Sequence, residues 1–177
     1  MDGQTWQDQG LTHYQAGAYD QAIDAFANAQ AAYEQAGNPE SAAEMLNNQG
    51  VAYRMLQEWN KAETAFTEAR ERFIHQGDRG RQAQAATNLG MLANARGKSK
   101  EAVAYFEEAI AAFQTQRDRV RESDTWRVLS LAYFKQRRLL DALSAYSAAL
   151  DCAPRLSLGQ RFLRWLFRLP LRLLGGG

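Results

Sequence analysis

The stretch WRVLSLAYFKQRRLLDALSAYSAAL, residues 126–150, decides the fold of this chain. Its first half carries a small residue, Ser130, where two helix backbones can approach closely. Its second half places Ala142 and Tyr146 four residues apart, on one helical face, so that the aromatic ring fills the gap beside the alanine. The two halves together predict a pair of packed helices joined by the short turn QRRL.

The same pattern occurs four times, with a step of 40 residues. The aligned small residues are Gly10, Gly50, Gly90 and Ser130. The aligned alanine and aromatic pairs are Ala22 with Phe26, Ala62 with Phe66, Ala102 with Phe106, and Ala142 with Tyr146. One such helix pair cannot bury its apolar face alone, so the repetition predicts stacked neighbours that share a continuous core.

This pattern resembles the tetratricopeptide repeat (TPR) family, whose motif is W-x2-L-G-x2-Y…A-x3-F…P. The fourth repeat fits it best, through Trp126, Leu129, Ser130, Tyr133, Ala142, Tyr146 and Pro154. The period exceeds the usual length of about 34 and looks like the long-repeat branch typified by kinesin light chains and bacterial peptide-sensing regulators. The resemblance implies an all-α fold: a right-handed TPR superhelix, or α-solenoid, of four helix hairpins plus a C-terminal amphipathic helix.

The expected domain organisation follows from the repeat. Residues 1–154 form one array, and residues 155–177 form a basic amphipathic helix with a glycine tail. The four repeats are expected at about 3–38, 39–78, 79–118 and 119–154.

Nothing in the sequence assembles a catalytic or metal site. His13 and His75 fall in different repeats at unrelated positions, and Cys152 is the single cysteine. Metal sites need several such ligands at fixed spacing. We therefore expect no metal, no cofactor and no enzymatic activity. The N-terminus has no signal peptide and no apolar run reaches membrane-spanning length, so we expect a cytoplasmic protein peripheral to a membrane.

The resemblance also implies where a partner binds, since TPR proteins generally hold peptides or helices on the concave face lined by each first helix. In the family the residue before the Leu-Gly position often points into this groove, and here Asn48 and Asn88 occupy it. Their amides offer a donor and an acceptor to a peptide backbone. One turn further on, the same face carries Val51, Met91 and Leu131, followed by the remaining predicted groove residues, Arg54, Asn94 and Phe134. Packing between repeats is the alternative role for Val51, Met91 and Leu131.

The C-terminal stretch RFLRWLFRLPLRLLGGG, residues 161–177, differs from the rest of the chain. Five arginines and no acid follow Asp151, so the tail carries +5; the net charge of the whole chain is +1, which leaves −4 on the rest. On a helical wheel the arginines cover an arc of about 80° and the apolar residues about 240°. The predicted docking residues are Arg161, Phe162, Leu163, Arg164, Trp165, Leu166, Phe167, Arg168, Leu169 and Arg172.

A helix that only caps the last hairpin needs an apolar stripe of little more than about 100°. Three environments could bury the rest of the apolar face: a bilayer interface, an apolar groove on a partner or a second copy of the chain, and the protein's own concave groove. A bilayer suits it best, because arginines would meet lipid phosphates. Nucleic acid is not an expected partner. The chain outside the tail has a net negative charge, and the C-terminal helix is more hydrophobic than a phosphate-binding helix needs to be.

We therefore expect a non-enzymatic TPR adaptor that binds a protein or peptide client and docks by its C-terminal helix to a membrane surface or membrane complex, as an assembly factor would. The alternative is a soluble TPR scaffold or peptide sensor whose C-terminal helix mediates oligomerisation, partner binding or autoinhibition.

Overall fold

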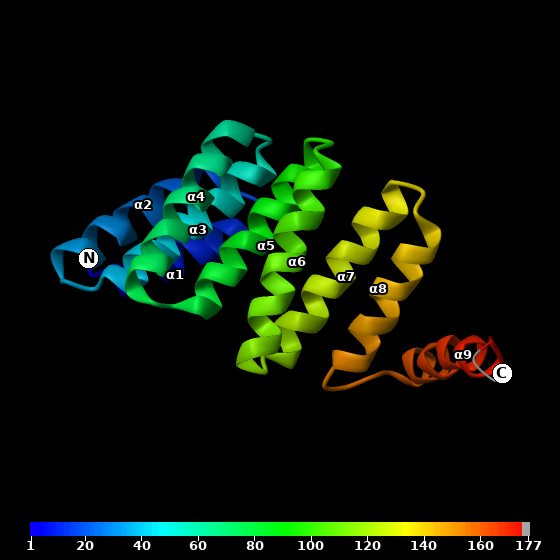
Figure 1. Cartoon of the computed structure of the whole chain (residues 1–177). Coiled ribbons are helices and arrows are strands. Elements are labelled where there is room, and N and C mark those ends of the chain that lie inside the picture. The colour runs from blue at the N-terminus through cyan, green and yellow to red at the C-terminus, as the bar shows by residue number, and fades with distance from the viewer. Residues whose placement is uncertain (175–177) are drawn as a thin grey trace. The chain divides into compact units, whose positions relative to one another are not determined.

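The structure is a computed structural model that describes the backbone of residues 1–174 and the side chains of residues 1–167. Within these residues every regular element is a helix (Figure 1). The helices are α1 (Gly3–Gln15), α2 (Tyr19–Gln35), α3 (Pro39–Met55), α4 (Trp59–Gln76), α5 (Arg79–Ala95), α6 (Ser99–Gln116), α7 (Arg119–Lys135), α8 (Leu139–Cys152) and α9 (Leu158–Leu174). The predicted all-α fold is confirmed.

The chain divides into two compact units, residues 1–105 and 106–177, and the boundary falls inside α6. In the first unit each helix from α1 to α5 packs against the next one along the chain, and α3 also contacts α5. In the second unit α7 packs against α8, and α8 against α9. This nearest-neighbour packing is the α-solenoid arrangement that the repeat predicted.

The first helix of each hairpin begins at a short polar residue whose side chain caps it. Asp2, Asn38, Asp78 and Asp118 accept hydrogen bonds from the backbone N–H three residues later, at 2.8, 3.1, 2.8 and 3.0 Å. Such caps satisfy amides that have no partner inside the helix. The last three caps are spaced by 40 residues, so the sequence repeat also fixes where these helices start.

The turn inside each hairpin contains one residue with a left-handed backbone. Gly17 and Gly97 hold this conformation with φ of 76° each, and Gln57 and Arg137 hold it with φ of 61° and 60°. A side chain in this conformation costs roughly 1–2 kcal/mol, which glycine avoids. The second and fourth hairpins therefore bear a backbone cost at their turns that the first and third do not.

The tightest packing of the first unit lies between a glycine and an aromatic ring in each hairpin. A Cβ atom added to Gly10 would lie 2.5 Å from Phe26 Cδ1, and one added to Gly50 would lie 2.6 Å from Phe66 Cδ1. Both rings are buried. The glycines thus allow each first helix to rest directly on the ring of its partner helix, as the sequence pattern predicted.

The fourth hairpin replaces this glycine by Ser130, which is buried. The Ser130 hydroxyl donates a 2.8 Å hydrogen bond to the backbone carbonyl of Ala142 on α8. Ser123, about two turns nearer the start of α7, donates in the same way to Ala149, at 2.9 Å. Two side-chain hydrogen bonds therefore join α7 to α8, and they satisfy hydroxyls that burial would otherwise leave unpaired.

The variant Gly50→Ala tests the close approach of α3 and α4. We expect it to lower the free energy of unfolding by about 1–3 kcal/mol, because the added methyl group overlaps Phe66. The double variant Gly50→Ala/Phe66→Leu should cost less than the sum of the single changes, as measured by urea denaturation. Gly159→Ala is the matched control, since nothing lies within 4 Å of that position. A Gly50→Ala protein as stable as the parent would contradict this packing.

Candidate functional site

The predicted groove asparagines lie on neighbouring first helices of the first unit. Asn48 is half-buried on α3, and Asn88 is half-buried on α5. The Asn88 Nδ2 donates a 2.9 Å hydrogen bond to the Oδ1 of Asn47. Asn47 is buried. The amide of Asn88 is therefore tied to its neighbour, and the side chain of Asn48 is the less constrained of the two predicted amides.

Four further predicted groove residues belong to the same two helices, and each is half-buried: Val51, Arg54, Met91 and Asn94. Val51 packs against the core cluster formed by Ala62, Phe66, Leu89 and Leu92, which is the packing role that the sequence left open for it. Arg54 differs, because its Nε is buried and finds no hydrogen-bond partner among the described residues.

The two remaining groove residues, Leu131 and Phe134, lie on α7 in the second unit. Their side chains are 61% and 63% exposed. They lie almost one helical turn apart, so they present one apolar surface to solvent. Between-repeat packing, the alternative role for Leu131, does not bury it within the described residues.

Helix α9 starts at a reciprocal cap between Ser157 and Gln160. The backbone N–H of Gln160 donates to Ser157 Oγ at 3.3 Å, and the backbone N–H of Ser157 donates to Gln160 Oε1 at 2.9 Å. This capping box fixes the start of the helix. It follows the break after α8, where Pro154 ends the preceding helix.

Helix α9 has two apolar faces with different surroundings. Leu163 and Phe167 are half-buried, and the Phe167 ring meets Tyr146 of α8 edge-on with centroids 6.3 Å apart. On nearly the opposite side, Phe162 and Trp165 are 59% and 57% exposed. Leu158 and Leu166 extend this second face and are also exposed, so we call Leu158, Phe162, Trp165 and Leu166 the outer stripe of α9.

Arg161 and Arg164 of α9 lie between the two faces. Arg164 forms an ion pair with Asp151 of α8, with Nε and Oδ1 2.8 Å apart, so it helps to hold the helix on its neighbour. Arg161 is exposed. Both line an open hollow of about 250 Å³ together with Leu156 and Trp165. The other predicted docking residues, Arg168, Leu169 and Arg172, lie outside the described side chains.

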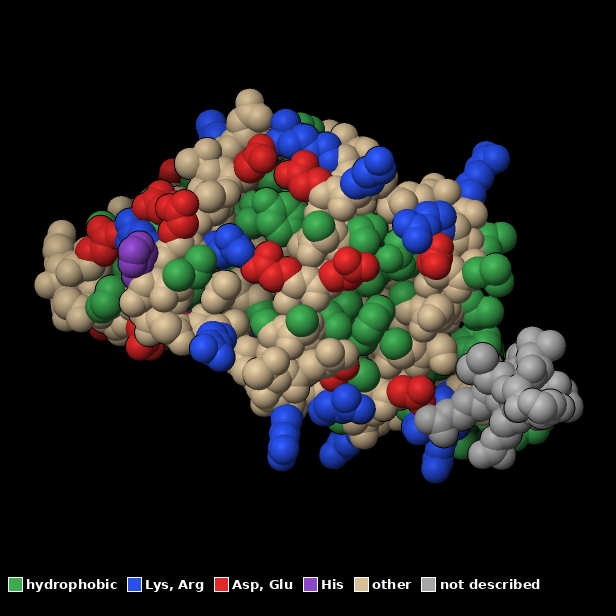
Figure 2. Space-filling view, viewed as in Figure 1, with side chains coloured by type: hydrophobic (Ala, Val, Ile, Leu, Met, Phe, Trp, Pro, Cys, Tyr) green, Lys and Arg blue, Asp and Glu red, His purple; other side chains and the backbone are tan. Residues whose placement is uncertain are grey.

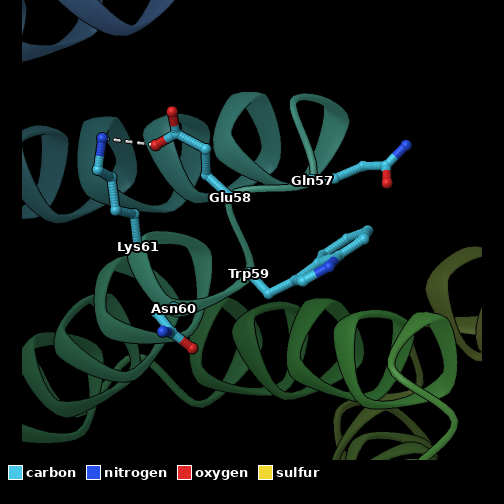
Figure 3. Close-up of a pocket in the computed structure, with 5 residues that line it drawn as sticks. All are labelled: Gln57, Glu58, Trp59, Asn60 and Lys61. Atoms are coloured by element: carbon cyan, nitrogen blue, oxygen red, sulfur yellow. Dashed lines mark ion pairs between the residues drawn. The ribbon is translucent and has the colours of Figure 1, made fainter.

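A second hollow, of about 430 Å³, opens at the turn between α3 and α4 (Figure 3). Its lining comes from one short segment, residues 57–61. The Lys61 Nζ lies 2.6 Å from Glu58 Oε2, so the two charges neutralise each other. Figure 3 shows Trp59 pointing away from this ion pair. The hollow gathers no set of reactive groups, and none of the predicted site residues lines it.

The second unit buries one polar cluster around Glu122. Gln114 donates to Glu122 at 2.9 Å, and the Arg119 guanidinium lies 3.0 Å away. Burial pushes the pKa of the Glu122 carboxyl upward, but hydrogen bonds from Gln114 and Cys152 and the charge of Arg119 outweigh it and hold the pKa below its usual value. Burial, followed by the hydrogen bond and charge of Glu122, raises the pKa of Cys152 to about 11. The thiol is thus kept protonated and unreactive.

The described residues contain no group of three or more His, Cys, Asp or Glu side chains placed to hold a metal ion. His13 lies on α1 and His75 on α4. No described helix is both long enough and apolar enough to cross a bilayer.

Comparison with known proteins agrees with the repeat pattern. A family model described as "Tetratricopeptide repeat" matches residues 3–75, 41–115 and 81–155, which confirms the resemblance inferred from the sequence. No curated protein matches the chain significantly.

Two solved structures share the fold. The crystal structure of BtubC (BKLC) from P. vanneervenii is 22% identical with a TM-score of 0.73, and the match covers 88% of this chain and 68% of that one. Aspartyl phosphate phosphatase F from Bacillus subtilis is 14% identical with a TM-score of 0.81, and the match covers 93% of this chain. It spans only 45% of the phosphatase, and identities this low show the fold alone.

The reactivity of Cys152 tests the buried cluster of the second unit. Its pKa of about 11 lies above the ordinary 9.0. The protonated thiol therefore stabilises the fold below about pH 9, and this contribution is lost as the pH rises through 11. At pH 8 we expect iodoacetamide to alkylate the folded chain about 100-fold more slowly than the urea-unfolded chain, because two pKa units change the thiolate fraction by about that factor. Equal rates would contradict the burial of this thiol.

Proposed function

Because this chain belongs to the tetratricopeptide repeat family, with matched residues running from 3 to 155, we propose that it is a non-enzymatic adaptor. Its first-helix faces hold a protein or peptide client, and its helix α9 docks it to a membrane surface or a membrane complex, in the manner of an assembly factor. The family supplies the general role, since TPR arrays are scaffolds for protein–protein interaction.

The outer stripe of α9 is the observation that carries the docking part of the proposal. The cap on α8 uses only Leu163 and Phe167 of the described apolar side chains, while Phe162 and Trp165 remain more than half exposed. Each large apolar side chain left in water forgoes roughly 1.5–3 kcal/mol of burial. The stripe with Arg161 at its edge has the form of an interfacial helix, whose apolar face enters the acyl boundary while its basic edge meets phosphates.

The client part of the proposal rests on polar groups of the first unit. The half-buried amide of Asn48 can pair with a peptide backbone. The Nε of Arg54 is already desolvated and lacks a hydrogen-bond partner among the described residues. The half-buried Arg54 also adds a positive charge to this face, which favours an extended peptide with an acidic side chain as the occupant.

In a second candidate function, the outer stripe of α9 is buried against another protein surface and does not contact lipid. The contacts of Phe167 with Tyr146 and of Arg164 with Asp151 hold one side of α9 on α8. A helix already held on its own array can present its other side to a second copy or a soluble partner. In this form the chain is a TPR scaffold or peptide sensor, and no membrane is involved.

Vesicle flotation separates the two candidates. With vesicles of phosphatidylcholine and phosphatidylserine at 7:3, we expect the full chain to float. Phe162→Ser/Trp165→Ser should weaken partitioning by roughly tenfold or more, because two aromatic side chains no longer enter the interface. Deletion of residues 156–177 should abolish flotation. Gly159→Ala is the control on the same helix, since its surroundings are open.

A full chain that never floats with anionic vesicles would overturn the membrane proposal. Particles of at least twice the monomer mass that become monomers in the Phe162→Ser/Trp165→Ser variant would instead establish the second candidate, with the outer stripe as the oligomer contact.

A further inference from the structure

The turn between α7 and α8 carries an exposed apolar tip that the repeat pattern does not require. Leu139 and Leu140, the first two residues of α8, are 61% and 83% exposed. At the register of Leu140 the other three hairpins have Asp20, Asn60 and Lys100, all exposed. Position 140 therefore faces solvent in every hairpin, and only the fourth hairpin places a large apolar side chain there.

Basic residues surround this tip. Lys135, Arg137 and Arg138 precede the leucines directly, and all three are exposed. Arg138 is held in place, with its Nε 2.7 Å from Asp141 and its guanidinium 4.4 Å from the centre of the Tyr133 ring. Arg137 occupies the left-handed position that glycine fills in two of the other hairpins. The turn thus bears a backbone cost of roughly 1–2 kcal/mol at a residue that adds a positive charge at the tip.

The exposed leucines and α9 border the same side of α8. Leu139, Leu143 and Tyr146 recur at helical spacing and form one stripe along α8. The Phe167 ring of α9 meets Tyr146, whereas Leu139 and Leu143 remain exposed. In Figure 2, hydrophobic side chains gather along the outer edge of α8. The second unit therefore carries exposed apolar side chains at both ends of α8: Leu139 and Leu143 near its start, and the outer stripe of α9 near its end.

The net charge of this region indicates whether a second copy of the chain or an anionic surface binds there. From residue 135 onward the sequence has eight Lys and Arg residues and two acids, Asp141 and Asp151, which gives a net charge of +6. A second copy would bring two such regions together, and like charges oppose that contact. An anionic surface is attracted instead, by about 1 kcal/mol for each basic residue close to an anionic leaflet. The exposed leucines then have an apolar layer to enter.

We propose that the α7–α8 turn is a second lipid-contacting element, which inserts Leu139 and Leu140 into the same anionic bilayer surface that α9 contacts. This inference rests on the proposed docking of α9 and adds an orientation to it. Two elements at opposite ends of α8 define a line on the membrane, whereas α9 alone leaves the array free to rotate about one helix. The second unit, which presents Leu131 and Phe134 on α7, would then be held at a fixed angle to the bilayer.

A fluorescent reporter at the tip tests the insertion. The full chain with Leu140→Cys is labelled with an NBD maleimide; the buried Cys152 thiol stays protonated, so labelling is selective for position 140. We expect NBD emission to rise and shift to the blue on mixing with 7:3 phosphatidylcholine–phosphatidylserine vesicles, and doxyl-labelled lipid to quench it. Ile74→Cys, a position exposed on α4 of the first unit, is the matched control and should not respond.

A second variant measures the contribution of the leucines. Leu139→Ser/Leu140→Ser leaves the charge unchanged and removes only the apolar tip. We expect it to weaken vesicle partitioning by roughly tenfold, while Ile74→Ser leaves partitioning unchanged. Circular dichroism of the variant checks that the helices are retained.

The outcomes separate this inference from the proposed function. Vesicle binding with an unresponsive reporter and unchanged partitioning of the serine variant would overturn the inference and leave α9 docking intact. A full chain that does not bind vesicles would overturn both. Binding of soluble poly-glutamate in place of vesicles would identify an acidic protein surface as the partner and would also overturn the lipid assignment.

Discussion

The close approach of the two helices in each hairpin is the constraint on which the rest of the structure depends. Gly10 and Gly50 allow α1 and α3 to rest on the rings of Phe26 and Phe66, and the gaps are too small for a single methyl group. The rings held in this way are 1% and 0% exposed, so each of these two hairpins buries a whole aromatic side chain between its helices. Ser130 meets the same demand through a hydrogen bond to the facing backbone.

Helices that pack only on their neighbours leave an exposed end. In the second unit α9 covers the part of α8 near Tyr146 and Asp151, through Phe167 and Arg164. The start of α8 stays open, and so does the outer stripe of α9. The exposed apolar side chains of this unit therefore follow from the geometry of a solenoid whose last helix leaves the start of its neighbour uncovered, and they lie in a strongly basic part of the sequence.

Much of the fold could be predicted because the residues that make each packing contact recur at the same register in successive 40-residue repeats. Ala62 and Phe66 are interpretable because Ala22 and Phe26 stand at the same register. The repeat does not show in which direction an individual polar side chain points. Asn47 and Asn48 are identical neighbours, and only the backbone geometry buries the first and pairs it with Asn88. The apolar face of α9 is so wide that the wheel cannot tell Phe167, which meets α8, from Trp165, which does not.

The exposed apolar turn of the fourth hairpin could not be predicted from the sequence for a related reason. The segment QRRL could be predicted to form a turn. The exposure of Leu139 and Leu140 could be recognised only from the structure, in which no described helix covers the start of α8. Hydrogen exchange with anionic vesicles present is the most direct measurement of the central claim, which is docking through this end of the chain. We expect slower amide exchange in residues 136–143 and 156–167, with the helices of the first unit unchanged. Protection confined to α1, α3 and α5, or none at all, would contradict it.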